Sequence, residues 1–176
     1  MDIINSFNIP KESLIIITGG KSRSECLLLG TKAASGDIYL FLHADSILPE
    51  NWADIVRNCL KSDIDVAVGA FSFKFMDSDL KLKIFLKVIQ FFANVRSKWL
   101  QLPYGDQGLF MYKEVYEIIG GFPRQPILED YDFILSARSL GKVHIVDESL
   151  ETSARRWFVN GVIGNTLFNQ VIFILK

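Results

Sequence analysis

The chain has 176 residues, 49% of them hydrophobic and 22% charged, with a formal net charge of −1. This length suits a single domain with a sizeable core, and so balanced a charge gives no electrostatic reason to expect a nucleic acid partner. The two cysteines are too few for a disulfide framework or a Cys-x-x-Cys metal site, and they fit a reducing compartment such as the cytoplasm.

Apolar runs alternate with segments of helical periodicity along the whole chain. In chain order, the pattern predicts a strand at 14–18, a helix at 22–34, a strand at 37–42, a helix at 49–61, a strand at 66–75, helices at 79–99, 113–119 and 129–140, a strand at 142–146 and a helix from 155 onward. Strands that alternate with helices are typical of an α/β domain with a mostly parallel sheet.

Two apolar stretches, 84–95 and 158–176, raise the question of membrane insertion. The first is short and carries Lys87 and Gln90, and the second carries three asparagines and one glutamine. Neither pattern predicts a helix that spans a bilayer. Either stretch could lie on a membrane surface, although a helix that packs on the core is the favoured interpretation.

The first candidate site follows the strand predicted at 37–42. His43 and Asp45 fall there, and ligands of open α/β sheets bind beyond the carboxyl ends of the strands. A carboxylate in this place could reach a divalent metal and, through it, a phosphate. Asp45 could equally cap a turn or the next helix, and a lone loop histidine more often has a structural role.

A second group of acids surrounds the helix predicted from 129. Glu129 and Asp130 begin this helix, and Asp106 lies in a glycine-containing segment before it. Acids at a helix start complement the helix dipole, which explains them in most proteins. Here they follow the tight turn at 120–123, so an ionised Asp130 could instead act as a general base toward a hydroxyl.

The third cluster is basic and aromatic and consists of Arg155, Arg156 and Trp157. The arginine fork binds phosphate oxygens in pairs, and an indole can stack on a ring. These residues would therefore suit a nucleoside diphosphate. The alternative is a basic helix start that pairs with Glu148 or Glu151 on the surface.

Five motifs occur in one order: HAD at 43–45, GDQGLF at 105–110, GGFP at 120–123, LEDYDF at 128–133 and SARRW at 153–157. This combination resembles the family 2 glycosyltransferases, inverting enzymes with a GT-A fold. Within them it is most similar to the bacterial subgroup described as radical-SAM/selenodomain-associated transferase 2. The resemblance covers roughly residues 20–170. It implies a three-layer sandwich with a mostly parallel central sheet.

The implied activity is transfer of a hexosyl unit from a nucleotide-diphosphate sugar to a hydroxyl acceptor, in the cytoplasm or at the inner face of the membrane. The resemblance implies that Asp45, with His43 in the first place of the motif, holds Mn²⁺ or Mg²⁺ on the donor diphosphate. Asp130 would be the catalytic base, with Glu129 beside it. Seven further residues would line the substrates: Gly105, Asp106 and Gln107 on the acceptor side, and Arg23, Arg155, Arg156 and Trp157 on the donor side.

The chain begins near the third strand of this family, and residues 1–13 are too few for the usual strand-helix-strand. We therefore expect one partial domain over 1–176. Its exposed sheet edge would favour association, for example into a homo-oligomer. Two other functions stay open: a non-catalytic or truncated sugar-nucleotide-binding protein, and a nucleotidyltransferase of similar fold. The second usually carries a glycine-rich basic loop after its first strand, which this chain lacks.

Overall fold

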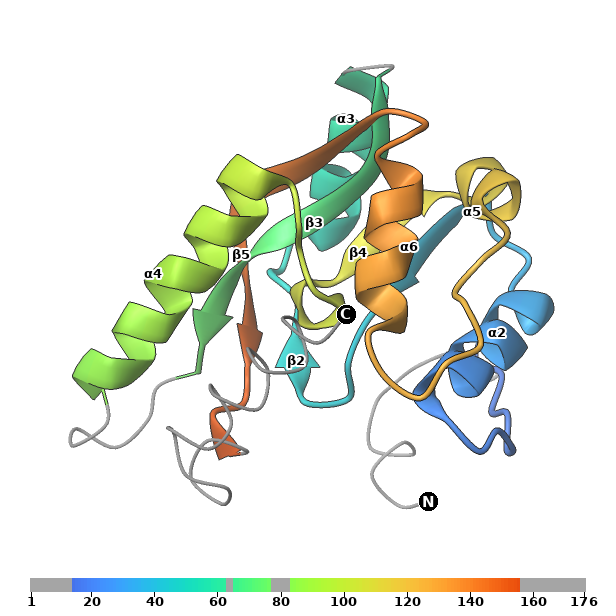
Figure 1. The fold of residues 1–176 in the computed structure, drawn as a ribbon, viewed down its shortest axis with the longest axis horizontal. Coiled ribbons are helices and arrows are strands. Elements are labelled where there is room, and N and C mark those ends of the chain that lie inside the picture. Colours follow the sequence, from blue (N-terminus) through green and yellow to red (C-terminus); the bar gives the residue numbers. More distant parts are fainter. Residues whose placement is uncertain (1–13, 63–64, 77–82, 156–176) are drawn as a thin grey trace.

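The computed structural model describes residues 14–62, 65–76 and 83–155. The helices in this part are α2 (Arg23–Ala33), α3 (Trp52–Ser62), α4 (Lys83–Leu100), the 3-10 helix η2 (Gly105–Gln107), α5 (Lys113–Ile119) and α6 (Glu129–Ala137). The strands are β1 (Ile38–Phe41), β2 (Ser46–Ile47), β3 (Val66–Phe75), β4 (Leu109–Tyr112) and β5 (Lys142–Thr152). They form one curled sheet with helices on both sides (Figure 1).

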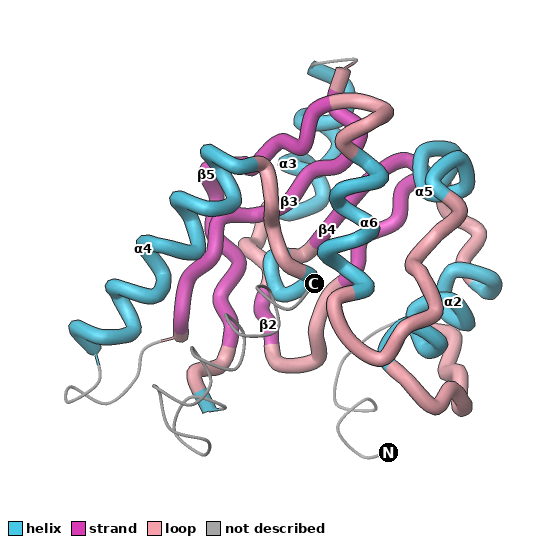
Figure 2. Tube along the Cα trace, viewed as in Figure 1, coloured by secondary structure: helices cyan, strands magenta, loops and turns pink. Residues whose placement is uncertain are grey.

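The sheet is a strongly curled, mostly antiparallel half-barrel with the strand order β1-β4-β3-β5-β2. Strand β4 is antiparallel to both β1 and β3, and β2 is antiparallel to β5. The long neighbours β3 and β5, side by side in Figure 2, are parallel. The predicted GT-A sandwich with a mostly parallel sheet is therefore wrong. Alternation of strands with helices does not fix strand direction, and β4 runs back between β1 and β3 after the short turn at η2.

The prediction of a strand at 14–18 is also wrong. Residues 14–20 form no helix or strand, and the apolar side chains of 14–17 are 36% to 64% exposed. An apolar run becomes a strand only where another strand offers its backbone groups. In the described part of the chain, no strand pairs with this run, and β1 forms the edge of the sheet.

Most other predicted elements are confirmed with small shifts in their bounds. Helix α2 begins after Ser22, whose hydroxyl accepts a hydrogen bond from the Glu25 N–H at 3.3 Å, as expected of an N-cap. Helix α5 ends at Gly120, which adopts a φ of +89°. Strand β5 continues to Thr152, well beyond its predicted end. The helix predicted from 155 lies outside the described residues after Arg155.

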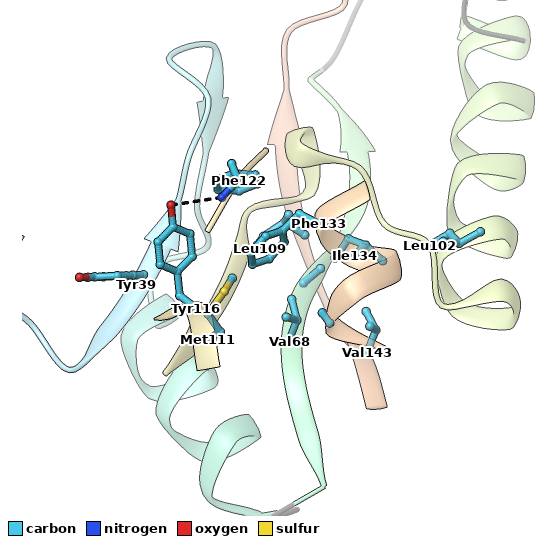
Figure 3. Packing of buried hydrophobic residues seen from close by; sticks show 12 residues of the cluster. Tyr39, Val68, Leu102, Leu109, Met111, Tyr116, Phe122, Phe133, Ile134 and Val143 are labelled. Carbon is cyan, nitrogen blue, oxygen red and sulfur yellow. Dashed lines mark hydrogen bonds between the residues drawn. The ribbon is translucent and has the colours of Figure 1, made fainter. Parts of the chain in front are cut away.

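Two apolar clusters fill the two faces of the sheet. Helices α5 and α6 cover one face, where Phe133 and Ile134 pack against Val68 and Leu109 (Figure 3). Helix α3 covers the other face and contributes Ile55, Val56, Cys59 and Leu60. No helix among the described residues is both long enough and apolar enough to cross a bilayer.

Gly69 is required inside β3 because an aromatic ring occupies the place of its side chain. Gly69 faces Phe110 across the β3–β4 pair, and a Cβ at position 69 would overlap the Phe110 ring. Glycine weakens a strand, but here the ring covers the exposed backbone. The ring also packs edge-on against Phe71, with the centroids 5.4 Å apart. This packing fixes β4 against the centre of the sheet.

Helix α4 closes the edge that β3 leaves open beyond Gly69. The Asn94 amide accepts a hydrogen bond from the Phe73 N–H at 2.7 Å and donates one to the Phe73 carbonyl at 2.8 Å. Gln90 accepts from the Phe75 N–H at 3.2 Å. These side chains take the place of a neighbouring strand, so the edge is protected from pairing with another chain.

Candidate functional site

The site is centred on Gly105, at the start of η2. The Gly105 N–H donates a hydrogen bond to Asp130 Oδ2 at 2.8 Å. A Cβ at position 105 would lie 3.2 Å from Asp130 Oδ2 and 3.3 Å from His43 Nε2. Both side chains therefore approach the same point, although they come from different ends of the sequence. Gly105 is needed because a side chain would push them apart.

Asp130 is held in position by the start of α6. Its Oδ1 accepts a hydrogen bond from the Tyr131 N–H at 2.9 Å, while Oδ2 is bound to Gly105. Leu128, just before the helix, adopts φ +60° and ψ +23°, in the left-handed region. A side chain costs about 1 kcal/mol there, and such strain is often found beside functional groups. The turn directs Glu129 and Asp130 inward, where both are buried.

Arg23 joins the site from α2. Its Nε donates a hydrogen bond to Glu129 Oε1, and its Nη2 lies 3.4 Å from Asp130 Oδ2. Partial burial lowers the pKa of Arg23, but the hydrogen bond to Glu129 and the nearby carboxylates outweigh it and raise the pKa overall. The side chain is 44% exposed, whereas Glu129 is 1% exposed. Arg23 thus neutralises a buried acid and presents part of its charge to solvent.

Asp106 lies in the same electrostatic environment. Burial raises the pKa of its carboxyl group, and the charge of Asp130 raises it further, while Arg96, His43 and Arg23 oppose both. Burial raises the pKa of the Tyr104 hydroxyl in the same way, opposed by Arg96. Asp106 therefore keeps its proton to a higher pH than a free aspartic acid. A carboxyl in this state can donate a hydrogen bond.

Gln107 attaches the η2 turn to the neighbouring strand and helix. Its side chain is fully buried; the amide donates to the Phe71 carbonyl at 3.0 Å, and the oxygen accepts from the Ser97 hydroxyl at 3.0 Å. The predicted acceptor-side segment therefore divides into two roles. Gly105 lies at the meeting point of His43 and Asp130, while Gln107 attaches the turn to β3 and α4.

Sequence reasoning missed two residues, Arg96 and Tyr104. The Arg96 guanidinium lies 3.5 Å from the centroid of the Tyr104 ring, in a cation–π contact, and its Nε donates to the Leu102 carbonyl at 3.0 Å. Tyr104 could have been found, because it directly precedes the GDQ motif. Arg96 lies on α4, nine residues before the GDQGLF motif, and nothing in the sequence singles it out.

The HAD turn reaches the end of β5. The Asp45 carbonyl accepts a hydrogen bond from the Ser153 N–H at 3.0 Å, which brings the first motif beside the last one. Arg155 is exposed two residues farther on. Arg156 and Trp157, predicted to bind the diphosphate, lie outside the described residues.

The residues predicted to hold a metal form an incomplete ligand set. Within 14–62, 65–76 and 83–155, no group of three or more His, Cys, Asp or Glu side chains could hold a metal ion. His43 and Asp45 could supply at most two ligands. Mg²⁺ in phosphoryl sites is typically bound by one or two carboxylates together with phosphate oxygens. Any further ligands of a metal at His43 and Asp45 would therefore have to come from a bound group such as a diphosphate.

A scan against models of known protein families finds no match, and a search of curated proteins finds none either. The described residues bring together a hydrogen-bonded carboxylate, an imidazole, a partly exposed guanidinium and a carboxyl of raised pKa. Such a group can bind an anionic ligand at Arg23 and accept a proton at Asp130.

Proposed function

We propose that the chain is an inverting glycosyltransferase that moves a sugar from a nucleotide-diphosphate sugar to a hydroxyl acceptor. We expect it to act in the cytoplasm or at the inner face of the membrane. The observation that carries the proposal is the approach of Asp130 and His43 to one point beside Gly105. General acid–base chemistry needs such a carboxylate in a fixed position.

Asp130 is the proposed base. Its two oxygens accept backbone hydrogen bonds from Gly105 and Tyr131, which fix its orientation. A carboxylate has about four lone-pair positions, so Asp130 can still accept the proton of an acceptor hydroxyl. The hydroxyl oxygen then attacks the anomeric carbon from the face opposite the diphosphate. The bond to the diphosphate breaks in the same step, the configuration inverts, and no covalent glycosyl-enzyme forms.

The other residues serve the donor and the charge that develops on it. The exposed part of the Arg23 guanidinium can bind phosphate oxygens without releasing Glu129. His43 and Asp45 would hold Mn²⁺ or Mg²⁺ together with the diphosphate, and a bound metal would stabilise the negative charge of the leaving group. Because the protein supplies at most two ligands, metal binding should be tight only when the nucleotide is present.

The sharpest test replaces Asp130 with asparagine. Asp130→Asn keeps the shape of the side chain but cannot take a proton, and its amide oxygen can accept only one of the two hydrogen bonds from Gly105 and Tyr131. We expect loss of nucleoside diphosphate release from a panel of nucleotide sugars, with UDP and Mn²⁺ binding by calorimetry unchanged. Asp132→Asn, the same substitution one half-turn farther along α6, is the matched control and should turn over normally. Near-normal turnover by Asp130→Asn would show that the base is another group.

One observation favours a second function, a sugar-nucleotide-binding protein without catalysis. Asp130 already accepts hydrogen bonds from two N–H groups and lies 3.4 Å from Arg23 Nη2, so part of its capacity to accept a further hydrogen bond is already used. In that case the wild-type chain would bind UDP and Mn²⁺ but release no diphosphate from any donor. Turnover of nucleoside triphosphates instead would indicate a nucleotidyltransferase.

A further inference from the structure

Helix α4 exposes its apolar side to solvent. Seven large apolar residues of this helix are exposed, and Trp99 and Ile84 are more than four-fifths exposed. The full set is Ile84, Phe85, Val88, Phe91, Phe92, Trp99 and Leu100. Most of these residues lie on one side of the helix, opposite Leu86, which packs against Phe73 and Phe75. A contiguous exposed patch of this kind on a helix usually marks a binding surface.

The inward side of α4 combines apolar residues with several polar ones. Gln90 and Asn94 bind the backbone of β3, and the buried Ser97 hydroxyl bonds to Gln107. A helix on the surface of a globular protein normally turns its apolar side to the core. Here hydrogen bonds and the packing of Leu86, Ile89 and Ala93 attach the helix to the sheet, and the outer phenylalanines and Trp99 take no part in that attachment. Their presence needs another explanation.

The charge of α4 indicates what its outer side binds. The helix carries Lys83, Lys87, Arg96 and Lys98 and no acidic residue, although the whole chain has a net charge of −1. The lysines are spaced by four and eleven residues, so they follow one flank of the apolar side. Lys98 reaches Asp147 at 2.7 Å, and Lys87 is exposed. Aromatic residues beside lysines are typical of helices that lie in the plane of a membrane surface.

We propose that the outer side of α4 binds an anionic lipid surface, with Phe91, Phe92 and Trp99 in the headgroup region. The lysine flank disfavours the other occupants. A second copy in a two-fold contact would bring the same lysines near one another. The segment 156–176 contains Arg156 and Lys176 but no acid, so it offers the lysines no opposite charge. This inference specifies which surface of the protein contacts a membrane and that the lipids there are anionic. It rests on the fold rather than on the transferase activity.

Cosedimentation of the full chain with lipid vesicles tests the proposal. We expect binding to vesicles of equal parts phosphatidylcholine and phosphatidylglycerol, and much weaker binding to pure phosphatidylcholine. Phe91→Glu and Trp99→Glu should abolish binding. Ile118→Glu is the matched control, since Ile118 is an equally exposed apolar residue on another helix, α5, and it should bind normally. Lys87→Gln should weaken binding about fivefold, and high salt should weaken it further.

Tryptophan fluorescence provides an independent measurement. Trp99 should enter the headgroup region, so emission should shift to the blue on vesicle binding and the shift should be lost in Trp99→Phe. Asp130→Asn should bind vesicles normally, which separates this proposal from the catalytic one. Absence of binding to anionic vesicles would overturn the proposal. So would a concentration-dependent dimer that Phe91→Glu dissociates, because the second copy would then be the occupant.

Discussion

Gly105→Ala should separate activity from stability at this site. The added Cβ would lie 3.2 Å from Asp130 Oδ2 and 3.3 Å from His43 Nε2, closer than side chains normally approach, so both groups must move by a few tenths of an ångström. Overpacking of this kind costs about 1–3 kcal/mol, and the stiffer unfolded chain returns about 0.4–1 kcal/mol. We expect a net loss in the free energy of unfolding of about 1 kcal/mol.

Gly105→Ala should lower the activity more strongly than it lowers the stability. Misplacement of a catalytic group by about 1 Å can cost about 100-fold in rate, so a smaller shift of Asp130 should lower diphosphate release roughly tenfold. Urea unfolding gives the stability and release of nucleoside diphosphate gives the rate. Gly30→Ala in α2 is the matched control, because a Cβ there meets no atom within 4 Å; it should gain about 0.5–1 kcal/mol and turn over normally. A stable Gly105→Ala protein with wild-type turnover would refute the placement of the reaction beside Gly105.

Three further predictions concern stability and can be read from urea or thermal unfolding. The pKa of Asp106 is raised above 3.8 in the fold, so the folded state binds more protons than the unfolded state, and the free energy of unfolding falls as the pH rises from the unfolded to the folded pKa. Asp106→Asn should remove this fall. The same dependence of stability on pH in the variant and the wild type would contradict the prediction. Gly69→Ala should lower the free energy of unfolding by about 1–3 kcal/mol, because the added Cβ overlaps the Phe110 ring. In the double variant, Phe110→Leu should recover part of this loss. Arg23→Met leaves the buried Glu129 carboxylate without its ion pair and should cost about 1–3 kcal/mol, most of which Glu129→Gln should restore.

Local signals in the sequence predicted the helices well. Ser22 before α2 and Gly120 after α5 act within one turn of chain, so neighbouring residues are enough to place those helix ends. Strand β4 was not predicted at all, and its pairing, like the fate of residues 14–18, depends on partners far away in the sequence. No local pattern carries that information, and the parallel sheet was predicted wrongly for this reason.

The candidate site likewise has features that local sequence signals indicate and features that depend on contacts between distant residues. Motif order directed attention to Asp130 and His43, which the fold brings to one point beside Gly105. It could not show that Gln107 is a buried support or that Arg23 pairs with Glu129. Periodicity likewise identified an apolar side on α4. It could not tell which side faces the sheet, because that depends on the edge of β3.

The double hydrogen bond between Asn94 and Phe73 also fixes the orientation of α4 about its own axis. An amide that both donates and accepts tolerates little rotation, so the helix cannot roll to hide its aromatic side chains without breaking both bonds and exposing the edge of β3. Turned outward permanently, this surface cannot be switched off by a rotation of the helix. Control over the proposed lipid contact would then require a molecule that covers this surface.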